Sequence, residues 1–214
     1  MIEVYNVFTP HACNTIINEF NNDDRRSPGT TGCNVYDDQW KKSTDLGLDF
    51  LKDSSKTFND IIKPGLVKAL DLYVQKYPVL NQGATWHIAD AYNIQHYKDG
   101  EGYIAPHIEY MPWPNTDFIL RMLAWMVNLN DSPCGTEFLI QKQILQAQQG
   151  NVSIWPAYWT HHHKGVTPNI GDKYIATGWC VYEAMDPAPD GFNSRPKILK
   201  DTILSTQQSA HWYD

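Results

Sequence analysis

The sequence has no uninterrupted run of about 18 apolar residues, the length that a transmembrane helix requires, so we expect no membrane-spanning helix. Positive charge is also limited: the sequence has 17 lysines and arginines and 24 acidic residues, which gives a net charge of −7. Surfaces that bind nucleic acids or anionic membranes are usually basic. The composition therefore predicts a protein with neither a nucleic-acid partner nor a membrane partner.

Cysteine is scarce as well. The four cysteines are dispersed along 214 residues and form no CxxC pair, so their spacing indicates neither a zinc site nor a disulfide framework. We interpret them as reduced thiols. Residues 1–5 are acidic and strand-like and do not resemble a signal peptide. We therefore expect a cytoplasmic protein, with a monomer as the default oligomeric state.

The residues that are present predict one domain over residues 1–214, because 42% hydrophobic and 13% aromatic residues can build a sizeable core. Within it we expect three parts. Residues 1–83 carry an N-terminal strand and supporting helices, residues 84–185 form a β-rich core, and residues 186–214 form an extended tail.

The N-terminal part is predicted from its capping residues and apolar spacing. A strand over residues 2–8 precedes a helix that begins at Thr9-Pro10 and runs to Phe20, because threonine caps helices and proline suits their first turn. A polar loop over residues 21–35 follows. Two further helices are expected, over residues 43–51 and 58–77.

From Ala84 onward the pattern changes to short strands separated by glycine, proline, asparagine and aspartate. Such a pattern is typical of an antiparallel sandwich or barrel. The expected strands cover residues 85–97, 119–129, 136–140, 144–147, 151–155 and 173–183.

His107 and Glu109 are the first candidate metal ligands. Side chains two residues apart on a strand point to the same face, so an imidazole and a carboxylate would lie side by side there. A later histidine beside them would complete the two-histidine, one-carboxylate set that binds iron(II) and leaves coordination positions open. The candidates are His161, His162 and His163, of which strand alternation places the first and third on one face.

The order of these pieces resembles the 2-oxoglutarate- and iron(II)-dependent dioxygenases of the prolyl 4-hydroxylase-like family. Each piece alone is weak, but their order and spacing together are fairly specific, over the C-terminal two thirds of the chain. The resemblance is carried by residues 95–100, 103–109, 126–131, 135–138 and 150–156, and by His163, Gly171, Lys173 and Trp179.

The resemblance implies a fold that is mostly β with N-terminal helices, a double-stranded β-helix or jelly roll. It also implies the cofactors iron(II), 2-oxoglutarate and O2, with His107, Glu109 and His163 as metal ligands. His163 is preferred over His161 because the family has a histidine eight residues before a glycine and ten before a lysine. The family usually has aspartate where this chain has Glu109.

The cosubstrate and substrate contacts follow from the same resemblance. Lys173 would pair with the distal carboxylate of 2-oxoglutarate, with Tyr97 and Tyr103 as phenol donors, although the lysine could lie in water and the rings in the core. Alternation along the strand places Thr177 and Trp179 on the face of Lys173, so both could also line the pocket. Arg121 is a candidate for binding substrate or for a structural salt bridge. Two tryptophans could shape a proline-sized pocket or pack in the core: Trp113 and Trp155.

The activity that the resemblance implies is hydroxylation of an unactivated C–H bond, with 2-oxoglutarate converted to succinate and CO2. A prolyl residue in a peptide or protein is the first expected substrate, and a free amino acid or another small molecule is the alternative. Because Glu109 departs from the family pattern, a jelly-roll protein that binds metal or ligand without turnover is kept as a second class. A zinc hydrolase is disfavoured because it gives Lys173 no role.

Overall fold

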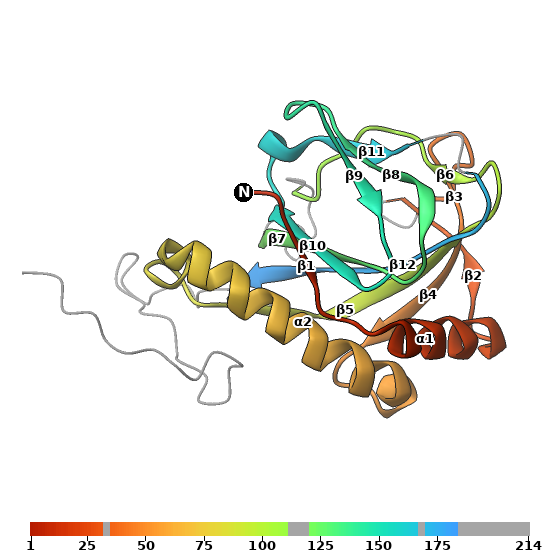
Figure 1. The fold of residues 1–214 in the computed structure, drawn as a ribbon, viewed down its shortest axis with the longest axis horizontal. Coiled ribbons are helices and arrows are strands. Elements are labelled where there is room, and N and C mark those ends of the chain that lie inside the picture. Colours follow the sequence, from red (N-terminus) through yellow and green to blue (C-terminus); the bar gives the residue numbers. More distant parts are fainter. Residues whose placement is uncertain (32–34, 111–119, 167–169, 184–214) are drawn as a thin grey trace, which may run out of the picture.

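The computed structural model describes residues 1–31, 35–110, 120–166 and 170–183. These residues form two facing antiparallel sheets, with two helices on the outer side of the larger sheet (Figure 1). No helix in these four ranges is long and apolar enough to cross a membrane. The prediction of a mostly β jelly roll with N-terminal helices is confirmed.

The larger sheet joins strands from both ends of the described chain, in the order β1-β10-β7-β12-β5-β4-β2, with every neighbouring pair antiparallel. The strands are β1 (Glu3–Asn6), β2 (Ser27–Pro28), β4 (Thr44–Asp49), β5 (Trp86–Tyr97), β7 (Arg121–Asn128), β10 (Asn151–Pro156) and β12 (Lys173–Tyr182).

The smaller sheet has the order β11-β8-β9 and covers the inner face of the larger one (Figure 1). Its strands are β8 (Ser132–Phe138), β9 (Gln143–Ala147) and β11 (His163–Gly165). A two-stranded ribbon of β3 (Lys41–Lys42) and β6 (Gly102–Tyr103) lies beside it. Three 3-10 turns complete the described elements, Asp53–Ser55, Pro78–Asn81 and Trp159–His161.

Two apolar layers follow from the alternation of side chains on the central strands. On β7, Leu123, Trp125 and Val127 pack toward the helices, whereas Ala124 and Met126 pack toward the smaller sheet. A strand that is buried on both faces has no polar alternation. This explains why residues 122–127 read as one continuous apolar run.

The two helices cover the outer face of the larger sheet (Figure 1). Helix α1 (Pro10–Asn22) begins as predicted, because the Thr9 hydroxyl accepts a hydrogen bond from the Ala12 amide at 3.2 Å. Helix α2 (Lys56–Lys76) agrees with the helix predicted over residues 58–77 and contains Pro64 in its interior. Both bury their apolar faces in the core shared with the sheet.

The helix predicted over residues 43–51 is wrong. This segment contains β4, which pairs with β5 along six residues. Leu46 and Leu48 are buried while Gly47 between them is exposed, which is the two-residue period of a strand. Pairing with the sheet therefore outweighs the helix-capping signal of Ser43-Thr44-Asp45.

The polar loop predicted over residues 21–35 contains the end of α1 and strand β2. His107 and Glu109 do not lie on a regular strand, because His107 forms only an isolated bridge with His163. The predicted tail over residues 186–214 lies outside the described residues.

Candidate metal centre

Backbone pairing brings two of the candidate ligands, His107 and His163, together. The amide of His107 donates to the carbonyl of His163 at 2.9 Å, and the amide of His163 donates back at 3.0 Å. This reciprocal pair places the two imidazole rings 4.4 Å apart between centroids. His163 is the first residue of β11, which β8 fixes by pairing it with Phe138.

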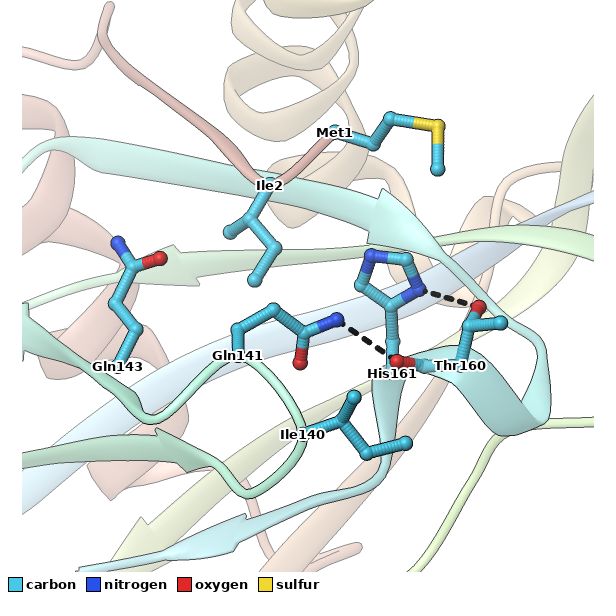
Figure 2. Close-up of a pocket in the computed structure, with 7 residues that line it drawn as sticks. All are labelled: Met1, Ile2, Ile140, Gln141, Gln143, Thr160 and His161. Carbon is cyan, nitrogen blue, oxygen red and sulfur yellow. Dashed lines mark hydrogen bonds between the residues drawn. The ribbon is translucent and has the colours of Figure 1, made fainter.

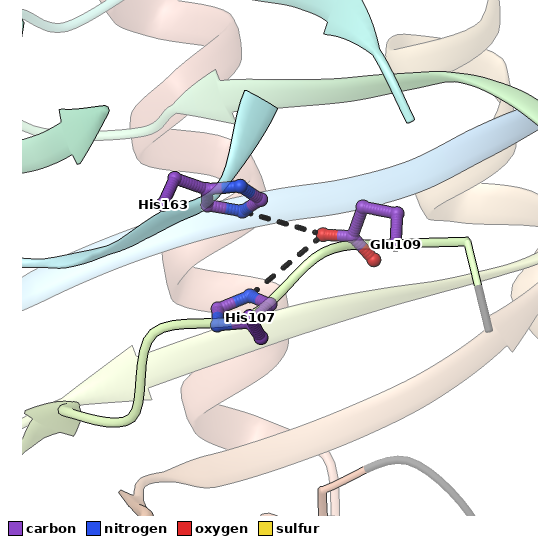
Figure 3. Close-up of side chains that lie close together, drawn as sticks. All are labelled: His107, Glu109 and His163. Atoms are coloured by element: carbon purple, nitrogen blue, oxygen red, sulfur yellow. Dashed lines mark ion pairs between the residues drawn. The ribbon is translucent and has the colours of Figure 1, made fainter. Parts of the chain in front are cut away.

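Glu109 completes a three-residue cluster with these histidines (Figure 3). Its Oε1 lies 3.9 Å from Nε2 of His107 and 3.5 Å from Nε2 of His163. One possible ligand atom from each residue falls within 4.8 Å of the others. Two imidazole nitrogens and one carboxylate oxygen are the donors that a non-haem iron(II) site uses.

The second nitrogen of each imidazole determines which atom faces the cluster. Nδ1 of His107 lies 2.9 Å from the carbonyl oxygen of Ala105, and Nδ1 of His163 lies 2.8 Å from that of His161. A carbonyl only accepts hydrogen bonds, so each Nδ1 carries the hydrogen. Both Nε2 lone pairs therefore remain available for a metal, as in histidine metal sites generally.

The electrostatics of the cluster also fit a cation. Burial, together with the neighbouring His163, lowers the pKa of His107 to about 4, so this imidazole is neutral at pH 7. Burial alone would raise the pKa of Glu109. Its close contacts with His163, His107 and the guanidinium of Arg121 outweigh burial and hold this pKa well below its usual range. A neutral His107 and an ionised Glu109 have the protonation states that metal ligands need.

His161, the alternative distal ligand, lies elsewhere. Its buried side chain lines a separate cavity of about 290 Å³ together with Met1 and Ile2 (Figure 2). There its Nδ1 lies 2.9 Å from the Thr160 hydroxyl. His162 lines the larger cavity described next but is not part of the cluster. The structure therefore groups His163, and neither neighbour, with the other two candidates.

The cluster opens onto a cavity of about 1090 Å³ between the two sheets. Ligand sites usually have volumes of about 300 to 1,000 Å³, so this cavity has room for more than one small molecule. Its wall includes all the predicted site residues that the structure describes: Tyr97, Tyr103, His107, Glu109, Arg121, Trp155, His163, Lys173, Thr177 and Trp179.

Lys173 is buried in this wall, with 6% of its surface exposed. Its ammonium group donates to the carbonyl of Gly135 at 3.1 Å, and no carboxylate among the described residues forms an ion pair with it. Burial lowers the pKa of Lys173 to about 8. A buried ammonium without a carboxylate partner is costly unless an anion binds to it.

The two predicted tyrosines occupy different places in the cavity. Tyr97 on β5 is the direct cross-strand partner of Lys173 on β12, and its phenol donates to Gln95 at 2.6 Å. Tyr103 stacks on His107 with ring centroids 3.8 Å apart. Burial raises the pKa of Tyr103 to about 12 and that of Tyr97 well above its usual value, so both phenols keep their protons.

Arg121 and Trp179 make polar contacts with Glu109. The indole Nε1 of Trp179 donates to Oε2 of Glu109 at 2.8 Å, and Nη1 of Arg121 lies 3.6 Å from the same oxygen. The structure thus contains a salt bridge between Arg121 and Glu109, one of the two roles predicted for Arg121. Thr177, also on the cavity wall, donates to the backbone of Trp125 at 2.9 Å.

Trp155 lines the cavity and also belongs to the apolar cluster between the sheets, so it is at once a pocket residue and a core residue. Trp113 lies outside the described residues.

Several residues of the cavity wall were not predicted. Gln95 could have been found by strand alternation from Tyr97, because the two share a face of β5. Lys41 and Asp45 form a buried ion pair in the wall. No sequence spacing could have indicated either residue, because Lys41 is brought to the cavity by the pairing of β3 with β6. The exposed tryptophans Trp40 and Trp159 also border the cavity.

Comparisons with known proteins identify relatives of the fold. No protein-family model matches the sequence, and no curated protein matches it. Among solved structures, a viral collagen prolyl hydroxylase from Paramecium Bursaria Chlorella virus-1, in its 2-oxoglutarate complex, is similar with a TM-score of 0.61 and 15% identity. The match covers 85% of this chain and 96% of the viral chain.

Two further prolyl hydroxylase structures are similar. The Trichoplax adhaerens prolyl hydroxylase, in complex with a hypoxia inducible factor peptide fragment, has a TM-score of 0.62 and 14% identity, over 85% of this chain and 83% of that one. A Pseudomonas putida prolyl-4-hydroxylase has a TM-score of 0.58 and 12% identity, over 86% and 93%. This chain therefore has the fold of the prolyl 4-hydroxylases.

Proposed function

We propose that this protein is a 2-oxoglutarate- and iron(II)-dependent dioxygenase. The observation that carries the proposal is the presence, in one cavity, of the His107–Glu109–His163 cluster and the buried ammonium of Lys173. When bound, iron(II) and 2-oxoglutarate supply the chemistry: O2 oxidises 2-oxoglutarate to succinate and CO2, and one oxygen atom is inserted into a C–H bond of the substrate.

The residues of the chain have distinct roles in this proposal. His107, Glu109 and His163 hold the metal through two nitrogens and one oxygen, which leaves coordination positions open. Lys173 binds the distal carboxylate of 2-oxoglutarate, and Tyr97 beside it on β5 turns its phenol hydrogen from Gln95 to the same group. The anion would then supply the charge partner that Lys173 lacks among the described residues.

We propose a prolyl residue in a peptide or protein as the substrate. Three observations support this choice: the fold is that of prolyl hydroxylases, the Trichoplax enzyme is in complex with a peptide, and the cavity exceeds the size of a usual single-ligand site. Trp40 and Trp159, which are 56% and 70% exposed at its border, offer aromatic surface for a peptide. A free amino acid or another small molecule is the alternative substrate.

A second candidate function is a binding protein without turnover. The observation that favours it is Glu109, because glutamate is one methylene longer than the aspartate usual at this position in the family. Such a protein would bind metal and 2-oxoglutarate but form no succinate.

The test is an assay of proline-containing peptides and free proline with iron(II), 2-oxoglutarate and O2. We expect a peptide product heavier by one oxygen atom, with succinate formed in equal amount, and no product with His107→Ala or without 2-oxoglutarate. Oxidation of free proline alone would select the small-molecule alternative. Binding of 2-oxoglutarate without succinate would select the binding protein.

The compartment and oligomeric state remain proposals from the sequence, namely a cytoplasmic monomer without nucleic-acid or membrane partners. Cys13 and Cys180 are buried free thiols, which supports a reducing compartment. Light scattering of the purified protein would test the monomer.

A further inference from the structure

The two oxygens of the Glu109 carboxylate face different partners. Oε1 faces Nε2 of both histidines, so both ion pairs drawn in Figure 3 end on this one atom. Oε2 accepts the indole hydrogen of Trp179 at 2.8 Å and lies 3.6 Å from Nη1 of Arg121. Hydrogen bonds that involve a charged group are stronger and more directional than neutral ones. The carboxylate is therefore fixed in one orientation.

Trp179 and Arg121 act as one unit. The guanidinium carbon of Arg121 lies 3.4 Å from the ring centroid of Trp179, within the range of a cation–π contact. They are carried by β12 and β7, which pair with each other in the middle of the larger sheet. Nη1 of Arg121 also donates to the backbone carbonyl of Glu109 at 3.3 Å. The unit thus contacts both the carboxylate and the backbone of Glu109.

The partners are also shielded from water. The side chains of Arg121 and Glu109 are 11% and 15% exposed. Screening by solvent is weak at such sites, so the contacts are worth more than surface ion pairs. By contrast, Glu109 lies on a segment without regular strand structure, in which the backbone alone does not fix the side chain.

We propose that Trp179 and Arg121 are positioning residues that hold Oε2 of Glu109 and so present Oε1 alone to the metal. This inference rests on the proposed metal site. We call Trp179 and Arg121 together the clamp. Glutamate has one more methylene, and so one more rotatable bond, than the aspartate usual at this position. By holding Oε2, the clamp restricts this rotation and allows Glu109 to act as a metal ligand. The inference assigns both residues to the metal ligand and not to the substrate.

Cobalt(II) binding provides the test, because the d–d spectrum of cobalt reports affinity and geometry without turnover. Trp179→Phe keeps an aromatic ring beside Arg121 but removes the donor to Oε2. We expect cobalt affinity to fall by about 10- to 100-fold, the usual effect of removing a partner of a metal ligand, with a changed cobalt spectrum.

The matched control is Trp86→Phe. The indole of Trp86 also donates one hydrogen bond, to the carbonyl of Leu80 at 3.2 Å, but Trp86 belongs to the core between helices and sheet. This variant should lose some stability and keep the cobalt affinity and spectrum of the unaltered protein.

A second variant guards against misfolding of Trp179→Phe. Arg121→Lys keeps the positive charge and loses the planar guanidinium that stacks on Trp179. It should also weaken cobalt binding and alter the spectrum, whereas a purely electrostatic role for Arg121 predicts no change.

The outcomes separate this inference from the proposed function. If the unaltered protein binds no cobalt, the metal site itself is wrong, and the clamp falls with it. If the unaltered protein binds cobalt and both Trp179→Phe and Arg121→Lys bind it equally well, the clamp is wrong and the metal site stands. Weakened binding in either folded variant, with Trp86→Phe unchanged, supports the clamp.

Discussion

At the scale of single residues, the site divides into what spacing can predict and what it cannot. His107, Glu109, His163 and Lys173 belong to local patterns of fixed order, and the structure gathers them in one cavity. The contacts of Trp179 with Glu109 join residues 70 positions apart. Such contacts depend on the path of the whole chain, so the sequence indicated a cavity-lining Trp179 but not its hydrogen bond.

His163 and His161 give a direct test of the ligand assignment. His163→Ala removes an imidazole that lies 3.5 Å from Glu109, so we expect cobalt binding to be lost. His161→Ala removes a side chain that lines the separate cavity beside Met1, so affinity should be kept. Titration with cobalt measures both. Loss of binding in His161→Ala, with His163→Ala unaffected, would reverse the assignment.

Lys173 makes the stability of the ligand-free protein depend on pH. Its native pKa is about 8, below the ordinary value of 10.5. Between these values the unfolded chain binds more protons than the native one, so the free energy of unfolding rises with pH. The gain approaches about 3 kcal/mol, at roughly 1.4 kcal/mol for each pH unit.

Urea denaturation below pH 8 and above pH 10.5 measures this gain, and Lys173→Met provides the reference for all other titrating groups. The variant should lack the rise that the unaltered protein shows. Identical pH profiles for the two proteins would mean that Lys173 is not a buried ammonium in the free protein.

At the scale of elements, strands with a strict two-residue period and helices with clear caps were predictable. Thr9-Pro10 marked the start of α1, and six strands lie close to their expected positions, namely β5, β7, β8, β9, β10 and β12. Strand β4 was missed because six residues with a capping signal fit a helix as well as a strand. The choice between them is made by pairing with β5, in which Asp45 lies opposite Gln95, a residue 50 positions later in the sequence.

Gly178 tests the packing of the central strand β12. A Cβ atom there would lie 2.5 Å from Cζ2 of the fully buried Trp125, closer than atoms can pack. We expect Gly178→Ala to lower the free energy of unfolding by about 1–3 kcal/mol, the usual cost of overpacking. Urea denaturation measures this loss.

The control for this substitution is Gly47→Ala on β4, where an added Cβ would meet only Asn93 Oδ1, at 3.7 Å. Its stability should be unchanged or slightly higher, because alanine restricts the unfolded chain more than glycine does. Equal losses in both variants would show that strand glycine itself, and not contact with Trp125, sets the cost.

At the scale of the whole molecule, the site connects distant parts of the chain. The cavity lies between two sheets whose strands come from residues 3–182, and the N-terminal strand β1 forms one edge of the larger sheet. The order of motifs predicted this jelly roll, because each short piece had a known place in it. The ribbon of β3 and β6, which brings Lys41 into the cavity wall, had no such motif and was not predicted.

Ligands that bind only the folded state should stabilise the entire domain. Cobalt at about 100 times its dissociation constant should raise the free energy of unfolding by about 2.7 kcal/mol, and 2-oxoglutarate should add a further increment. Thermal denaturation measures both increments. Lys173→Met should keep the stabilisation by cobalt and lose most of the stabilisation by 2-oxoglutarate. If 2-oxoglutarate stabilised this variant as much as the unaltered protein, the assigned role of Lys173 would be contradicted.

The most direct measurement is anaerobic titration of the iron(II)-loaded protein with 2-oxoglutarate, followed in the visible spectrum. We expect a metal-to-ligand charge-transfer band that saturates with 2-oxoglutarate, is absent in His107→Ala and His163→Ala, and disappears with formation of succinate when O2 is admitted. A well-folded protein that shows neither the band nor succinate would contradict the proposed dioxygenase.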